Sequence, residues 1–246
     1  MVITWVGHAT VLLELEGVRL LTDPVLRDRI GPLVRIAPPG EAEPVGLVDC
    51  VLLSHLHRDH ADLPSLRAVA RSIPVLVPPG AGSWLARRGL TNVRELGPGR
   101  EVAVGALQIV ATAAAHRARR GPLGPRADPV GYMVRGPRSV YFAGDTDLFD
   151  AMEELRGSVD VALLPVWGWG TRLGPGHLDP ERAARAAALI APDVAIPIHW
   201  GSLAPLWPGG RISDPWGPPR EFARLAQRLA PAVKVRLLAP GGRTEV

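Results

Sequence analysis

The chain has 246 residues, of which 47% are hydrophobic and 21% charged, as in globular proteins large enough to bury a substantial core. No segment approaches 18 uninterrupted apolar residues, which excludes a transmembrane helix, and a single cysteine, Cys50, excludes an intrachain disulfide. The formal net charge is +4, and Lys234 is the only lysine, so arginine supplies the other 27 of the 28 basic residues. Because Met1 leads directly into an apolar segment with no basic leader, we expect a cytoplasmic protein.

The first half of the chain alternates short apolar strands with two helices. Asp62 is placed to cap the first helix, Pro64 fits its first turn, and Gly89 marks the end of the second. In chain order we predict strands over 2–6, 10–15 and 18–21, a loop over 31–46, a strand over 49–54, a helix from 62 to about 71, a strand over 74–78, a helix over 81–88, and strands over 101–104 and 107–111.

The second half opens with a basic loop and then alternates strands with helices. Pro197 lacks an N–H, which predicts that it lies at a sheet margin or at a strand end. We predict a loop over 117–129, strands over 130–134 and 139–143, a helix over 150–155, a strand over 159–166, a loop over 167–177, a helix over 180–190, a strand over 194–198, a loop over 200–219, a helix over 220–229 and a strand over 233–238. With no repeat, linker or low-complexity tail, residues 1–246 predict a single domain.

Three histidines and an aspartate follow the strand predicted over 49–54. His55 and His57 alternate as in an extended segment, so both project to one side, while Asp59 and His60 fall where the chain turns. Neutral imidazoles and a carboxylate are ligands that suit zinc, iron or manganese. A polar loop with scattered histidines is the alternative, but three of only seven histidines lie here.

This HxHxDH spacing resembles the signature of the metallo-β-lactamase-fold hydrolases. The resemblance implies an α/β protein, an α+β four-layer αββα sandwich with two metals at its mouth. His116, Asp145 and His199, each after a predicted strand, complete the ligand order of that family. The resemblance implies two groups of metal ligands and a bridging carboxylate: His55, His57 and His116 in one group, Asp59, His60 and His199 in the other, and Asp145 between them.

The same resemblance implies a hydrolase with two divalent transition-metal ions, zinc or else manganese or iron. A hydroxide bridging the ions would be the nucleophile, because such a centre lowers the pKa of bound water towards ~7. The residual positive charge suits an ester, lactone or phosphodiester in an anionic substrate. Oxidoreductase members of the family carry a glutamate at the position of His57, so the histidine favours hydrolysis.

The sequence around His8, Asp23 and His177 resembles the pattern of one branch of the family. This branch contains L-ascorbate-6-phosphate lactonase and N-acyl-phosphatidylethanolamine phospholipase D. Asp23 is expected to accept a hydrogen bond from a ligand imidazole, although a plain turn aspartate is the alternative. His8 fits a structural hydrogen bond beneath the site and a substrate contact equally well. His177 is expected to contact the substrate or to protonate the leaving oxygen, and the alternative is that it caps a helix. Asp59 and His177 are the two residues expected to be catalytic.

Aromatic and basic residues lie near these histidines. We expect Trp167, Trp169 and Trp200 to form pocket walls, although loops packing over the sandwich are the alternative. Arg117 belongs to a basic loop that is either solvated or grips a phosphate or carboxylate. Together these features predict a small-molecule or lipid-like substrate that is anionic or amphiphilic.

Two other classes of function compete with this hydrolase. The sequence pI of about 10.1 suggests a metal-dependent nuclease acting on RNA or DNA, but nucleases of the family usually add a large domain or arm, which 246 residues do not accommodate. A non-catalytic scaffold is expected to lose ligands, and none is missing here. The sequence leaves peripheral membrane contact and oligomeric state open.

Overall fold

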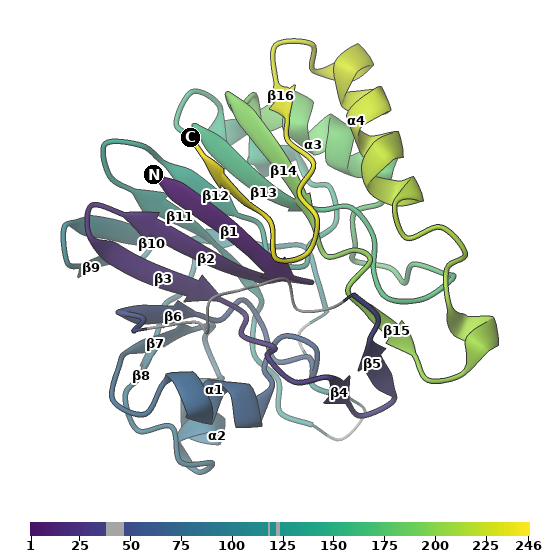
Figure 1. Ribbon diagram of the computed structural model, residues 1–246. Helices are drawn as coiled ribbons and strands as arrows, with labels where there is room; N and C mark the ends of the chain where they lie inside the picture. The colour runs from purple at the N-terminus through teal and green to yellow at the C-terminus, as the bar shows by residue number, and fades with distance from the viewer. Residues whose placement is uncertain (38–46, 118, 122–123) are drawn as a thin grey trace.

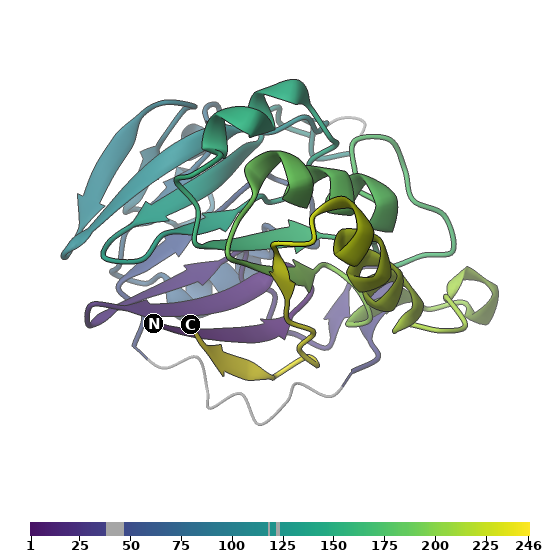
Figure 2. The same cartoon turned by 90° about the horizontal axis from the view of Figure 1, so that it is seen from above.

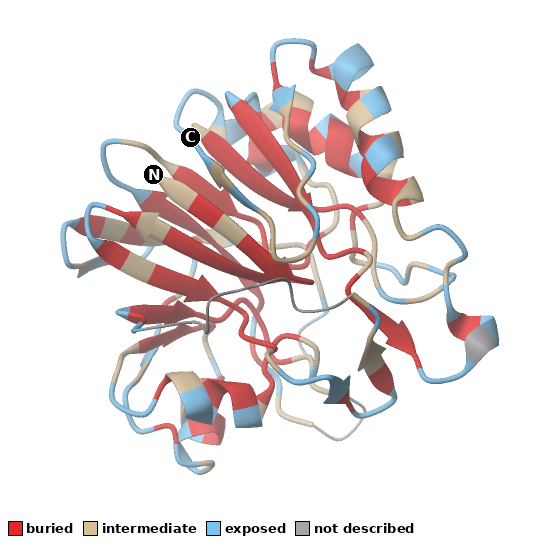
Figure 3. Ribbon diagram, viewed as in Figure 1, coloured by how far each residue is buried: buried red, intermediate tan, exposed pale blue. Residues whose placement is uncertain are grey.

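Two β-sheets pack face to face, and helices cover their outer faces (Figure 1), (Figure 2). The structure, a computed structural model, describes residues 1–37, 47–117, 119–121 and 124–246. Its interior is apolar where the sheets meet, and the exposed residues gather on loops and on the outer faces of helices (Figure 3). This is the four-layer αββα arrangement predicted above.

The first sheet has seven strands and contains both ends of the chain. Four of its strands pair antiparallel, and the other three continue the sheet with parallel pairing. In spatial order the strands are β17 (Arg243–Glu245), β1 (Val2–Gly7), β2 (Thr10–Leu15), β3 (Val18–Thr22), β6 (Cys50–Leu52), β7 (Val75–Val77) and β8 (Val93–Glu95). The pairing of β17 with β1 brings the two termini side by side (Figure 1).

The second sheet also has seven strands. An antiparallel half made from neighbouring chain segments continues into a parallel half whose strands alternate with helices. In spatial order the strands are β16 (Lys234–Val235), β14 (Val194–Ile198), β13 (Val161–Pro165), β12 (Val140–Phe142), β11 (Val130–Arg135), β10 (Leu107–Ala113) and β9 (Glu101–Val104). The C-terminal ends of its parallel strands face one edge of the sandwich, where polar side chains collect.

Helices shield each sheet from solvent on its outer side. The helical segments are α1 (Leu63–Val69), α2 (Gly82–Ala86), the 3-10 helix η1 (Asp150–Leu155), α3 (Pro180–Ile190), the 3-10 helix η2 (Pro208–Gly210) and α4 (Gly217–Leu229). Leu66 of α1 and Leu85 of α2 pack on the first sheet, while Ala187 of α3 and Phe222 of α4 join the main core. Across the described residues, no helix is long and apolar enough to cross a membrane.

Two local predictions, the cap of α1 and the position of Pro197, can be compared with the structure. The Asp62 side chain accepts a hydrogen bond from Ser65 N at the start of α1, as its predicted role as a cap requires. Pro197 lies beyond the point where β16 pairs with β14, because that ladder involves only Val194 and Ala195. The missing N–H of Pro197 therefore costs no sheet hydrogen bond from that side. Pro197 is next to the last residue of β14, which agrees with the predicted strand end, whereas β14 lies between β16 and β13 and not at the sheet margin.

Long-range pairing produced the main departures from prediction. Residues 31–46 and 200–219 were predicted as loops, yet they contribute two strands of a third sheet, ordered β15 (Leu203–Pro205), β5 (Leu33–Arg35) and β4 (Arg29–Ile30); residues 38–46 lie outside the described residues. Strands β8 and β17 were also missed. The strand predicted over 233–238 is reduced to Lys234–Val235, and α4 begins at Gly217 rather than residue 220. These short edge segments become strands only because a distant segment pairs with them.

Candidate metal centre

All seven histidines of the chain gather at the edge where the strands end. They are His8 after β1, His55, His57 and His60 after β6, His116 after β10, His177 before α3 and His199 after β14. The centroids of neighbouring imidazole rings are between 3.9 and 6.4 Å apart. The fold therefore brings together every histidine that the sequence places in the site.

Asp145, which follows β12, lies in the middle of these rings. Its Oδ2 atom is 3.2 Å from His60 Nε2, and its Oδ1 atom is 3.1 Å from His199 Nε2. The same Oδ2 atom is 3.8 Å from His55 Nε2 and 3.9 Å from His116 Nε2. This buried carboxylate faces both halves of the cluster, as a bridging ligand would have to.

Besides His8, the other six histidines each have one ring nitrogen fixed by a protein oxygen. The contacts are His55 Nδ1 to Ser54 Oγ (2.9 Å), His57 Nε2 to Arg119 O (3.1 Å), His60 Nδ1 to Asp23 Oδ2 (2.7 Å), His116 Nδ1 to Gly176 O (2.6 Å), His177 Nδ1 to Gly174 O (3.0 Å) and His199 Nδ1 to Trp167 O (2.7 Å). A carbonyl or carboxylate oxygen only accepts, so the nitrogen facing it carries the proton. The other nitrogen of each neutral ring then carries a lone pair directed at the cluster.

These lone pairs face each other in two places. His57 Nδ1 is 3.1 Å from His116 Nε2, and His60 Nε2 is 3.1 Å from His199 Nε2. Two neutral acceptor nitrogens at this distance need a proton or a metal cation between them. His55 Nε2 is also buried and has no hydrogen-bond partner in the described part of the chain. The lone pairs of these nitrogen atoms therefore fit divalent cations as ligands.

The ligand atoms fall into two compact groups. One group is His55, His57, His116 and Asp145, and the other is His8, Asp59, His60 and His199; within each, the atoms lie within 4.8 Å of one another. These groups contain the two sets expected from the sequence, but His8 joins the second group and Asp145 belongs to the first alone. Asp23, His55 and His60 form a third group that overlaps both. His8 is 2% exposed and its Nε2 lies 3.1 Å from Asp59 Oδ2, which favours the structural hydrogen bond over the substrate contact.

Asp23 supports two of the candidate ligands from behind. One of its oxygens accepts from His60 Nδ1, and the same oxygen accepts from the Ser54 hydroxyl at 2.5 Å. Because the Ser54 hydroxyl donates to Asp23, its oxygen is left to accept from His55 Nδ1. Asp23 thus has the position that the sequence predicted, whereas the relay through Ser54 was missed, although this serine directly precedes the HxHxDH motif.

Burial and nearby carboxylates shift the pKa values of the histidines in opposite directions. Burial lowers the pKa of His116 to about 4 and the pKa of His199 to about 3, so both rings are neutral near pH 7. Burial also lowers the pKa of His60, but the carboxylates of Asp145 and Asp23 outweigh it and raise that pKa well above its usual value. A proton therefore competes with a metal ion for the nitrogen of His60.

The backbone is strained where it carries the site. His8, Asp23 and His199 have positive φ angles of 53°, 32° and 65°, values that residues other than glycine rarely adopt. Gly144 also has a positive φ, and a Cβ atom there would lie 2.7 Å from Ser54 Cβ. Glycine at this position allows Asp145 to approach the strand end that carries His55.

A cavity of about 560 Å³ opens over the histidines. It is lined by residues of both candidate groups and of the two covering loops, among them His57, Asp59, Arg117, Arg119, Trp169 and His177. The indole nitrogen of Trp169 donates to Asp59 Oδ2 at 3.1 Å, and the Trp169 side chain is 37% exposed. Arg117 and Trp169 therefore have the positions expected of substrate-contacting residues.

Trp167 and Trp200, also predicted as pocket walls, do not line this cavity. Trp200 is only 1% exposed, and its ring packs 4.8 Å from the ring of Trp5 in the core, so the prediction of a substrate contact is wrong. The Trp167 indole donates to Gly170 O, and the Trp167 carbonyl accepts from His199. This tryptophan therefore orients a candidate ligand instead of forming the wall.

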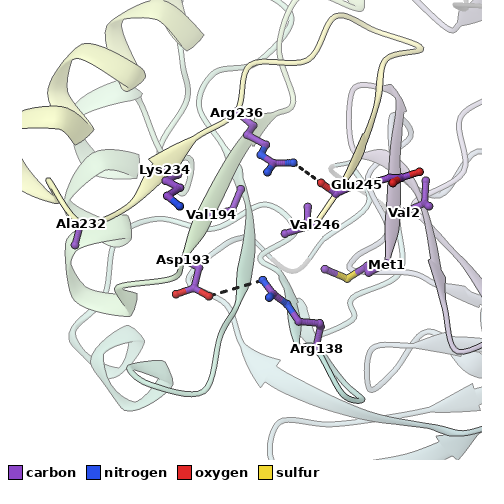
Figure 4. A pocket seen from close by; sticks show the side chains of 10 residues that line it. All are labelled: Met1, Val2, Arg138, Asp193, Val194, Ala232, Lys234, Arg236, Glu245 and Val246. Atoms are coloured by element: carbon purple, nitrogen blue, oxygen red, sulfur yellow. Dashed lines mark hydrogen bonds and ion pairs between the residues drawn. The ribbon is translucent and has the colours of Figure 1, made fainter.

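A larger cavity, about 960 Å³, lies between the edge strands of the two sheets, against the starts of β1 and β14 (Figure 4). Two of its arginines have protein partners: Arg138 pairs with Asp193 at 3.7 Å, and Arg236 donates to the Glu245 carbonyl (Figure 4). None of the histidines lines it. The smaller cavity is therefore the candidate site.

Comparison with known proteins agrees with this geometry. A family model described as a beta-lactamase superfamily domain matches residues 18–200. The chain belongs to this superfamily. A UPF0173 metal-dependent hydrolase of Methanopyrus kandleri is 36% identical over 247 residues and is matched over 97% of either chain. The chain is accordingly a metal-dependent hydrolase of the metallo-β-lactamase superfamily.

Two further proteins extend the comparison. The N-acyl-phosphatidylethanolamine-hydrolyzing phospholipase D 1 of Caenorhabditis elegans is 32% identical over 226 residues, which cover 81% of this chain and 63% of the nematode protein. The structure of Igni18, a metallo hydrolase from Ignicoccus hospitalis, superposes with a TM-score of 0.75 at 24% identity, covering 100% of this chain and 98% of that one. The second likeness concerns the fold, and both agree with the resemblance seen in the sequence.

Proposed function

We propose that this superfamily member is a dinuclear-metal hydrolase that cleaves a phosphodiester or lactone bond in an anionic or amphiphilic substrate. The observation that carries the proposal is the pair of facing imidazole nitrogens, 3.1 Å apart in each candidate group, with the Asp145 carboxylate between the groups. One metal cation between the nitrogens of each pair would satisfy both pairs, which supports a centre with two ions.

The two groups would share the ions as follows: His55, His57 and His116 for one, Asp59, His60 and His199 for the other, and Asp145 for both. When bound, two divalent transition-metal ions, zinc or else manganese or iron, would lower the pKa of a water molecule towards ~7 and stabilise charge on the attacking and leaving oxygens. The carbonyls and the Asp23 carboxylate that fix the ring tautomers keep the lone pairs aimed before any ion arrives.

His177 is placed to act on the leaving group. Its Nε2 atom is 3.3 Å from Asp145 Oδ2, and its side chain is 23% exposed at the cavity surface. Burial lowers the pKa of His177, but the Asp145 carboxylate outweighs this and raises it above the usual value. The raised pKa favours the protonated imidazole, the form that can donate a proton to the leaving oxygen.

The cavity wall supports an anionic substrate with an apolar part. Arg117 offers a guanidinium that matches a phosphate or carboxylate, and Trp169 offers an exposed aromatic face. The likeness to a phospholipase D that hydrolyses N-acyl-phosphatidylethanolamine agrees with a phosphodiester in the substrate. Asp59 is held by His8 and by the Trp169 indole, so this carboxylate keeps its direction at the cavity floor.

Metal quantification combined with a substrate panel tests the proposal. The purified protein, reconstituted with zinc, manganese or iron, is expected to hold two equivalents of metal and to turn over phosphodiesters or lactones. Thioesters, RNA and DNA complete the panel. Uptake of a single equivalent would contradict the dinuclear centre, and turnover of RNA or DNA alone would favour the nuclease.

A further inference from the structure

Arg120 turns away from the basic loop that it belongs to and reaches into the protein. Its Nη1 atom donates to the backbone carbonyls of Leu56 at 2.5 Å and Ala61 at 3.0 Å, and lies 3.4 Å from the carbonyl of His57. These three carbonyls belong to the segment 55–61, called here the ligand loop, which carries four of the candidate metal ligands. A single guanidinium therefore contacts three backbone carbonyls of the ligand loop.

The guanidinium is itself held in place. Its carbon lies 4.9 Å from the centroid of the Trp84 ring, and Trp84 is a buried residue of α2 that packs in the core beneath the first sheet. The guanidinium of Arg88 lies over the same ring at 4.1 Å. A cation held against an aromatic face has a defined position, so Arg120 links the ligand loop to a fixed element.

The neighbouring residue acts on the same histidine. The Arg119 carbonyl accepts from His57 Nε2 at 3.1 Å, which leaves His57 Nδ1 to face His116. The dipeptide 119–120 therefore fixes both the ring of His57 and the backbone beside it. Arg117 and Arg119 from the same loop also line the cavity, so the segment that meets the substrate is the segment that holds the ligand loop.

We propose that Arg120 is a positioning residue for the metal centre: it holds the ligand loop in the conformation that directs His57 and Asp59 towards their ions. This inference rests on the proposed dinuclear site. All three carbonyl contacts are made by the Nη1 atom, while the guanidinium carbon lies over the Trp84 ring. A lysine side chain has a single nitrogen, which cannot both reach these carbonyls and lie over the ring, so Arg120→Lys should restore only part of what Arg120→Ala loses.

Zinc affinity of the whole protein, measured by competition with a chromogenic chelator, tests this role. Arg120→Ala is expected to weaken zinc binding about 10- to 100-fold, as loss of a group that orients ligands does, with Arg120→Lys between it and the wild type. Arg126→Ala removes an exposed arginine of the same basic loop and is the matched control, expected to bind zinc like the wild type. Cobalt-substituted Arg120→Lys should show a changed visible absorption spectrum, because the ligand field at His57 is altered.

The outcomes separate the two proposals. If the wild-type protein takes up no zinc or cobalt, the proposal of a dinuclear site is wrong. A wild type that binds two ions, with Arg120→Ala and Arg120→Lys equal to it in affinity and spectrum, overturns the role of Arg120. Circular dichroism and thermal unfolding of the metal-free proteins identify a variant that fails to fold, and Arg120→Lys, which keeps the charge, then decides the question.

Discussion

The two large cavities of the molecule differ in how their polar groups are satisfied. At the cavity of about 960 Å³, the charged side chains of Arg138 and Arg236 already have protein partners. Beside the cavity of about 560 Å³, imidazole nitrogens face each other at 3.1 Å. Size alone would select the wrong cavity, whereas ligand atoms that need a cation select the right one.

The difference follows from where each cavity lies along the strands. The larger cavity lies against the starts of β1 and β14, where the edge strands of both sheets meet. The smaller one lies at the ends of β6, β10 and β12, beside the loop that follows β13. His199, after β14, joins the same cluster of ligands through its contact with His60. A rigid sheet edge holds such groups within the narrow tolerance that metal binding needs.

Replacing the central carboxylate should have the largest effect. Asp145→Asn keeps the shape of the side chain but removes the charge that serves both candidate groups, so we expect both metals to be lost or weakly bound. A metal ion contributes several kcal/mol to stabilising the transition state, and each ~1.4 kcal/mol is tenfold, so turnover should fall at least about 1,000-fold. Elemental analysis and turnover on the same sample measure this.

Asp128→Asn is the control for that variant, because Asp128 is an exposed aspartate outside the site. It should keep two metals and wild-type turnover. An Asp145→Asn protein that still holds two tightly bound metals would show that the carboxylate does not bridge them, and the contrast between the two cavities would lose its basis.

His177→Ala should separate proton transfer from metal binding. The ring of His177 lies 4.7 Å from that of His116, yet only His116 has a lone pair facing another ligand nitrogen. We therefore expect His177→Ala to keep two metals and to lose about 10²- to 10⁴-fold in kcat, the usual contribution of a general acid. His116→Ala, the matched variant, should lose metal as well. Loss of metal from His177→Ala would make that residue a ligand instead.

Removing the support behind the ligands should have a smaller effect. Asp23→Asn leaves both candidate groups complete but weakens the acceptor that orients His60 and, through Ser54, His55. We expect zinc affinity to fall about 10- to 100-fold, with turnover largely restored at saturating zinc. Chelator competition and a zinc titration of activity measure the two quantities. A variant that stays inactive at saturating zinc would place Asp23 in the chemistry itself.

The sequence revealed the candidate ligands because their spacing is local or anchored to predicted strands. The HxHxDH segment follows the strand that became β6, and Asp145 follows the Gly144 that lets the chain approach Ser54. Asp23 and His177 came from the resemblance to one branch of the family. In each case a short pattern carried the information, and the fold then needed only to bring the strand ends together.

What the sequence did not reveal depends on contacts between distant segments. Nothing local distinguishes Arg120, which turns inward to the ligand loop, from Arg117, which lines the cavity. Trp200 follows His199 directly, but its ring packs against Trp5 from the first strand, which only the assembled sandwich determines. The strands β5 and β15 likewise form because two predicted loops meet.

The opposite cavity should respond least of all. Arg138 lies 3.6 Å from Asp160 and 3.7 Å from Asp193, and all three side chains are partly exposed, so the pairs are surface ion pairs worth about 0–1 kcal/mol. The double variant Arg138→Ala, Lys234→Ala should therefore change the free energy of unfolding, measured in urea, by about 1 kcal/mol or less. Metal content and turnover should match the wild type, because the change lies at the far end of the strands. A large change in KM or kcat would mean that the cavity of about 960 Å³ also takes part in function. The presence of ion-paired side chains would then not identify an inactive cavity.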